Sequence, residues 1–150
     1  MRTIANKLET IIGQHLAALH DIAESKMIYK PSPSKWSKKE IMGHMIDSAQ
    51  NNIRRFIVGQ YEDEPKIIYN QDKWVELANY QQYNSTDLIN LWWVLNKHIC
   101  NILNNMPGEM GKRNCQTEAL HSIEWLAEDY LKHLRHHLHQ VLELEPVAYP

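Results

Sequence analysis

Apolar side chains recur along this chain at spacings of three and four residues, which is the period of an α-helix and not of a β-strand. Four separate stretches carry such an apolar stripe. They predict helices over roughly residues 2–25, from Ser37 to about Gln60, from Ser85 or Thr86 to about Met106, and from near Ser122 to about Leu144.

Local signals mark where several of these helices begin and end. Pro31 and Pro33 stop the first helix, because two prolines within three residues cannot continue it. Ser37 and Glu40 form a capping box, in which the serine hydroxyl and the glutamate carboxylate satisfy the first free amides of the second helix. Pro107 closes the third helix.

The connection over residues 61–84 is far longer than the roughly two to eight residues usual between antiparallel helices. It is long enough to cross the bundle, which allows the second and third helices to run parallel, and a short helical turn is expected near Trp74–Tyr80. Residues 107–121 are a second irregular connection. The sequence therefore predicts an all-α fold, a four-helix bundle with a long crossover between helices 2 and 3, in a single domain over residues 1–150.

Composition narrows the function classes. Apolar residues make up 43 % of the chain and charged residues 23 %, as in an ordinary globular protein. The net charge of −2 argues against a nucleic-acid partner, and no apolar run approaches the roughly 20 residues that span a membrane. The first residues lack the apolar core of a signal peptide, and Cys100 and Cys115 suit free thiols in a reducing compartment. We expect a cytoplasmic protein.

Nine histidines against one phenylalanine are the unusual feature of the composition. His133 and His137 are four residues apart, so their side chains lie on one face of the last predicted helix, one turn from each other. A helix offers two imidazoles to one metal ion with this spacing. In a histidine-rich segment the pair also arises by chance, and a partly exposed polar face is the alternative.

The second predicted helix carries a polar stripe beside its apolar face. At about 100° per residue, Asn51 and Arg55 fall roughly 20° to either side of His44, Ser48 lies about 40° away and Asp47 about 60° away. Facing helices of a bundle build metal and cofactor sites from such interior polar residues. A stripe that simply faces water is the alternative.

The second helix and the last helix each carry a longer motif. They are Lys35-Trp36-Ser37-Lys38-Lys39-Glu40-Ile41-Met42-Gly43-His44-Met45-Ile46-Asp47-Ser48 with Asn51 and Arg55-Phe56, and His133 with His137-Leu138-His139-Gln140-Val141. Together these motifs resemble the signature of the DinB/YfiT-like superfamily of metalloenzymes and fit its YfiT-like branch. The resemblance extends from Trp36 to Val141.

The resemblance implies a four-helix bundle with a long crossover and a metal triad made of one histidine from the second helix and a His-x-x-x-His pair from the fourth. Carried over by position, these ligands are His44, His133 and His137. It further implies a divalent metal ion (zinc, nickel or iron), a small-molecule substrate and a homodimer. The branch includes transferases that use low-molecular-weight thiols such as bacillithiol, and metal-dependent hydrolases. His136 and His139 do not match the triad and are assigned to the surface or to contacts around the ligands.

Three neutral imidazoles leave a coordination position open and the charge of the ion uncancelled, so a bound water or thiol becomes acidic. The same triad serves both reactions, and because the resemblance implies members that use low-molecular-weight thiols, the leading hypothesis is a thiol S-transferase. Hydrolysis by metal-bound hydroxide is the alternative, and a non-catalytic metal-binding or small-molecule-binding module is a third possibility.

Supporting roles follow from the stripe on the second helix. Asp47 is the candidate catalytic residue, able to orient a ligand or accept a proton, and Asn51 and Arg55 are candidate substrate-binding residues. Arg55 offers a fork for a carboxylate. The alternatives are a surface carboxylate for Asp47 and an ion pair with Glu62 or Glu64 for Arg55. Candidate aromatic walls of the pocket, for which core packing is the alternative, are Tyr69, Trp74, Trp92 and Trp93.

Overall fold

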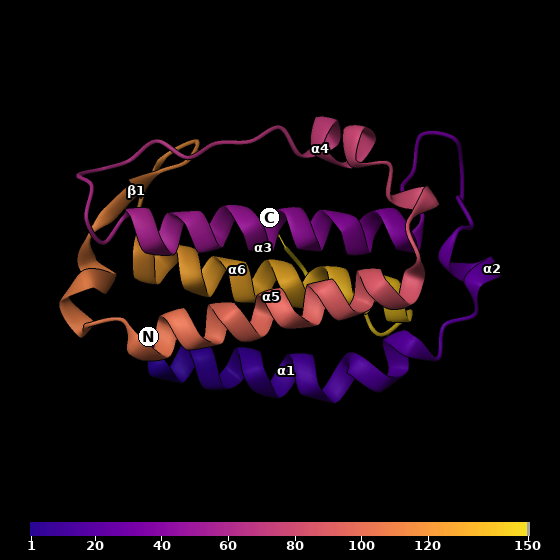
Figure 1. The fold of residues 1–150 in the computed structure, drawn as a ribbon, viewed down its shortest axis with the longest axis horizontal. Helices are drawn as coiled ribbons and strands as arrows, with labels where there is room; N and C mark the ends of the chain where they lie inside the picture. Colours follow the sequence, from indigo (N-terminus) through magenta and orange to yellow (C-terminus); the bar gives the residue numbers. More distant parts are fainter. Residues whose placement is uncertain (150) are drawn as a thin grey trace.

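Four long helices lie side by side in the computed structural model, which describes residues 1–149 (Figure 1). They are α1 (Arg2–His20), α3 (Lys38–Val58), α5 (Ser85–Asn105) and α6 (Ile123–Leu142). The connections hold shorter elements, which are α2 (Glu24–Met27), α4 (Gln71–Ala78), η1 (Tyr80–Gln82), η2 (Gly108–Lys112), β1 (Asn114–Gln116) and β2 (Leu120–Ser122). The predicted all-α four-helix bundle is confirmed.

The long connection between α3 and α5 runs back over the outside of the bundle and carries α4 (Figure 1). As a result α3 and α5 run in the same direction, and α6 runs antiparallel to both (Figure 1). Strands β1 and β2 pair antiparallel in a short hairpin. The crossover is fixed to this hairpin, because the Ile67 amide donates to the Gln116 carbonyl and the Gln116 amide donates to the Pro65 carbonyl. The crossover predicted from the length of residues 61–84 is therefore confirmed.

Helix starts follow the predicted capping signals closely. The capping box of Ser37 and Glu40 is present at the start of α3, and the Ser122 side chain caps α6. Asn84 caps α5, one residue before the predicted start. The first helix ends at His20 and not near residue 25. The short hairpin was not predicted, because strands of three residues are too short to show an alternation of apolar and polar side chains.

The polar stripe of α3 lies inside the bundle. His44, Asp47 and Ser48 are 2 %, 1 % and 5 % exposed, and Asn51 is also 5 % exposed. These four side chains are therefore buried in the bundle, whereas Arg55 is partly exposed. Both cysteines are buried and free. Among the described residues, no helix combines the length and hydropathy needed to cross a bilayer.

Gly43 allows the end of the crossover to lie directly on α3. A Cβ atom at position 43 would lie 2.0 Å from Cδ2 of Tyr80, the first residue of η1. Tyr80 in turn donates its hydroxyl hydrogen to Oδ1 of Asp47. The absence of a side chain at Gly43 thus sets the distance between η1 and the polar stripe of α3.

We expect Gly43→Ala to lower the free energy of unfolding by about 1–3 kcal/mol, because the added methyl group forces the Tyr80 ring away. Gly13→Ala is the matched control: it lies in α1, where a Cβ would meet no atom within 4 Å, and should raise the free energy of unfolding by about 0.5–1 kcal/mol. Urea denaturation measures both. Equal effects of the two substitutions would contradict this account.

Candidate metal centre

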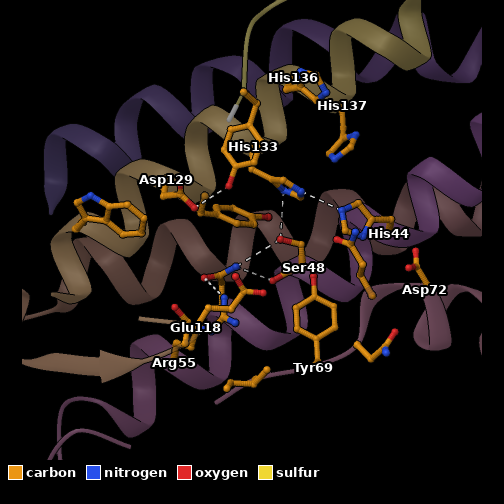
Figure 2. Close-up of a pocket in the computed structure, with 18 of the residues that line it drawn as sticks. His44, Ser48, Arg55, Tyr69, Asp72, Glu118, Asp129, His133, His136 and His137 are labelled. Carbon is orange, nitrogen blue, oxygen red and sulfur yellow. Dashed lines mark hydrogen bonds between the residues drawn. The ribbon is translucent and has the colours of Figure 1, made fainter. Parts of the chain in front are cut away.

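Helices α3 and α6 bring three imidazole rings together at one point of their interface. His44, His133 and His137 each offer a ring nitrogen, and these three nitrogens all lie within 4.8 Å of one another. The Nε2 atoms of His44 and His133 are 2.9 Å apart, although the two residues are 89 positions apart in sequence (Figure 2). The structure thus brings together the three residues that were predicted to form the metal triad.

The surroundings keep these rings neutral. Burial, and then the neighbouring His137, lower the pKa of His44 to about 3. Burial also lowers the pKa of His133 to about 2, with the other imidazoles adding to the effect. The pKa of His137 is lowered as well, mainly by burial. All three rings therefore carry a lone pair at neutral pH, which is the form that binds a metal ion.

The outer ring nitrogens show which atoms face inward. Nδ1 of His137 lies 2.8 Å from Oε1 of Gln140, and Nδ1 of His133 lies 3.4 Å from Oγ of Ser48. Nε2 is then the atom that each of these two rings has left for the centre. Nδ1 of His44 is buried and has no hydrogen-bond partner within residues 1–149.

This donor set fits a divalent metal ion. Two neutral imidazoles whose Nε2 atoms face each other at 2.9 Å need a hydrogen or a cation between them. Imidazole nitrogens suit zinc, nickel and iron alike. Within the described residues, no fourth histidine, cysteine or carboxylate joins the group, so a bound ion would keep a position for water or substrate.

A cavity of about 950 Å³ opens beside the three rings. Its wall comes from α3, the crossover, the hairpin and α6. The histidines and Trp36 line it, and Arg55 and Glu118 lie away from the histidines (Figure 2). Tyr69, one of the predicted aromatic walls, lines the cavity, whereas Trp92 is fully buried in the core.

Arg55 presents a partly free guanidinium group to this cavity. Its Nε and Nη2 both donate to the Ile67 carbonyl oxygen, at 3.3 and 3.1 Å, and its Nη1 donates to Oδ1 of Asn52 at 3.4 Å. Because a guanidinium has five N–H donors, two are left for a ligand. Burial lowers the pKa of Arg55. No carboxylate of the described chain forms an ion pair with Arg55. The alternative expected from the sequence, an ion pair with Glu62 or Glu64, is therefore not formed.

Asp47 and Asn51 lie on the other flank of α3. Oδ1 of Asp47 accepts from Tyr80, Oδ2 is buried without a partner in residues 1–149, and burial raises the pKa of Asp47 to about 6. The Asn51 amide donates to the Asp47 backbone carbonyl. Neither residue lines the cavity; Ser48 and Asn52 do.

The sequence did not indicate that Tyr149 lines the cavity, whereas His136 lies among the contacts around the ligands, one of the two places expected for it. Tyr149 lines the cavity, and its hydroxyl donates to Oδ2 of Asp129 at 2.9 Å. His136 also lines the cavity and contacts Gln140, which in turn contacts His137. The spacings of three and four residues among His136, His137 and Gln140 could have indicated these contacts, whereas nothing in residues 143–149 indicates a path back to α6.

Comparisons with known proteins agree with this geometry. The model of a family described as the DinB superfamily matches residues 8–141. A search of curated proteins found no match. A solved structure described as "YfiT from Bacillus subtilis is a probable metal-dependent hydrolase with an unusual four-helix bundle topology" superposes with a TM-score of 0.83. The identity is 20 %, over 94 % of this chain and 83 % of that chain, so this likeness shows the fold.

The low pKa of His44 predicts a pH dependence of stability in the metal-free protein. Its pKa is about 3 when folded and near the ordinary 6.5 when unfolded, so the unfolded chain binds more protons between these values. The free energy of unfolding should therefore fall as the pH drops below about 6.5, with up to about 1.4 kcal/mol per pH unit from this ring. Urea unfolding in EDTA from pH 7 to 5 measures it. His44→Gln should give a shallower slope, and an unchanged slope would contradict the assignment.

Proposed function

The chain belongs to the DinB superfamily, and we propose that it is a metal-dependent enzyme acting on a small molecule in the cavity beside His44, His133 and His137. The observation that carries the proposal is the convergence of three neutral imidazoles on the wall of an open cavity. A purely structural ion is closed off by four protein ligands, and a closed binding module would need the same. The triad instead supports a site at which a substrate can reach the ion.

The residues of the chain would divide the work as follows. His44, His133 and His137 would hold the ion, with Ser48 and Gln140 orienting two of the rings. When bound, a divalent metal supplies positive charge that lowers the pKa of a coordinated water or thiol. Asp47 and Asn51 would act through the conformation of α3, because Tyr80 and the helix backbone hold them away from the cavity.

Arg55 would bind a negatively charged group of the substrate. Its two remaining N–H groups and its position in the cavity wall support this role. A guanidinium binds a carboxylate or phosphate through two parallel hydrogen bonds. The substrate class we propose is therefore a small anionic molecule.

We propose hydrolysis as the reaction. Water is then the only co-substrate, and the YfiT structure with the same fold is described as a probable metal-dependent hydrolase. Transfer to a low-molecular-weight thiol such as bacillithiol is the second candidate. The cavity volume of about 950 Å³ supports this second candidate reaction. The volume is near the upper end of the range of about 300–1,000 Å³ for ligand sites, so the cavity has room for two small molecules.

The homodimer, the single domain over residues 1–150 and the cytoplasmic location stay predictions. Leu91 and Val94 on α5 are 37 % and 55 % exposed and would be available to a second copy. These expectations do not affect the reaction, since all three histidines come from one chain.

Metal analysis tests the site directly. Protein purified without chelating resin should hold about one zinc, nickel or iron per chain, and His44→Ala should lose it because two imidazoles alone hold the ion far more weakly. The matched control is His98→Ala, an exposed histidine on α5, which should keep the metal. An equal metal content in both variants would refute the assignment of His44.

Substrate charge and thiol dependence test the reaction. For an anionic ester, Arg55→Met should lower kcat/KM by about 10–100-fold, the equivalent of one charged hydrogen-bonded contact of about 1.5–3 kcal/mol. For the neutral analogue of the same ester, Arg55→Met should change kcat/KM little. The control is Arg54→Met, at an exposed arginine, which should leave kcat/KM unchanged for both esters.

The same assay with small thiols added separates the two reactions. Turnover that consumes water alone supports hydrolysis, and thiol consumption matched to turnover supports transfer.

For the Arg55→Met variant, an equal loss of kcat/KM with the charged and the neutral ester would contradict the role of Arg55.

A further inference from the structure

The chain turns back on itself after α6. Glu143 adopts a left-handed conformation with φ of 57°, which ends the helix, and residues 143–149, here called the C-terminal segment, then return along α6. Three side-chain hydrogen bonds hold this segment: His139 Nδ1 to the Glu145 carbonyl at 2.6 Å, His136 Nδ1 to the Val147 carbonyl at 2.6 Å, and the Tyr149 hydroxyl to Asp129 at 2.9 Å. The second of these bonds bears on the metal centre.

The bond to Val147 fixes the hydrogen positions on His136. A backbone carbonyl oxygen can only accept, so Nδ1 of His136 must carry the hydrogen that it donates. A neutral imidazole has one donor and one acceptor nitrogen. Nε2 of His136 is therefore an acceptor.

Gln140 passes this constraint on to His137. The end of its amide that lies 2.8 Å from Nε2 of His136 must be the NH₂ group, since an acceptor needs a donor opposite it. Its oxygen then faces Nδ1 of His137, also at 2.8 Å, and accepts a hydrogen from it. Consequently Nε2 of His137 carries no hydrogen and presents its lone pair.

We propose that Gln140 and His136, anchored by the Val147 carbonyl, are positioning residues that hold His137 in the one tautomer able to bind the metal. The inference rests on the proposed function, because it assigns His137 as a ligand. We call the three side chains His136, Gln140 and His137 the relay. Supporting hydrogen bonds to a metal-bound imidazole are generally worth about 10–100-fold in metal affinity.

The other two rings constrain only each other, because their Nε2 atoms lie 2.9 Å apart and either one can carry the hydrogen between them. The Ser48 hydroxyl near Nδ1 of His133 can donate or accept, so it selects neither tautomer. Nδ1 of His44 has no partner within the described chain. Of the three rings, His137 is therefore the one whose hydrogen position is set by groups outside the triad.

The tautomer can be read without any metal. In ¹⁵N-labelled, chelator-treated protein at about pH 8, long-range ¹H–¹⁵N spectra should show His137 and His136 both with the hydrogen on Nδ1. His137 with its hydrogen on Nε2 would overturn the proposal. Because the protein is metal-free, this result does not depend on the enzyme proposal.

Two substitutions at Gln140 then separate orientation from bulk. Gln140→Leu removes both bonds of the relay and should weaken zinc binding about 10–100-fold in competition with a chromogenic chelator. Gln140→Glu keeps an acceptor for His137 and should stay within a few-fold of the wild type with His137 still in the Nδ1–H form. His139→Leu removes a different bond to the C-terminal segment and is the control, with unchanged affinity.

Wild-type zinc affinity in Gln140→Leu, or a loss in His139→Leu equal to that in Gln140→Leu, would overturn the relay. A protein that shows the expected tautomer but binds no zinc, nickel or iron would overturn the proposed function and the purpose of the relay together. Thermal unfolding of the metal-free variants checks that each is folded.

Discussion

The burial of three imidazole rings between α3 and α6, at the edge of an open cavity, is the constraint on which the site depends. A buried ring nitrogen without a partner costs roughly 1–3 kcal/mol, and His44 carries one such nitrogen within the described chain. The same burial makes protonation of the rings unfavourable, so they remain neutral and keep their lone pairs. The buried imidazoles thus lower the free energy of unfolding of the metal-free protein, but they leave ring nitrogens that can bind a cation.

The topology places these rings opposite one another. His44 lies in the first third of α3, and His133 and His137 lie in the second half of α6. Because the two helices are antiparallel, the early part of one lies beside the late part of the other (Figure 1). The crossover between α3 and α5 also supplies Tyr69 and the Ile67 carbonyl that anchors Arg55, so one connection builds both the topology and a wall of the cavity.

The sequence was sufficient for the bundle, the crossover and the identity of the converging histidines, because helical periodicity, capping residues and two motifs are local or spaced signals. The sequence was not sufficient to predict which flank of α3 faces the cavity. Relative to His44, Arg55, Ser48 and Asn52 lie about 20°, 40° and 80° to one side of the helix, whereas Asn51 and Asp47 lie about 20° and 60° to the other. Asn51 and Arg55 are therefore equivalent on a helical wheel, and only the placement of α6 and the crossover separates them. Two of the three side-chain hydrogen bonds that hold residues 143–149 end on backbone carbonyls, which every residue has, so the pattern of side chains indicates little of this path.

The return of the C-terminal segment has a practical consequence for handling the protein. Tyr149 packs with its ring centroid 5.2 Å from that of His133, so a tag joined at this position would start beside the metal centre. A polyhistidine tag attached there would offer competing imidazoles at an effective concentration in the millimolar range. Such a tag could fill the open coordination position or draw the ion away. Met1 lies beside Gly111, near the first turn of α6 and at the opposite end of that helix, so a tag joined at Met1 would start far from the three rings.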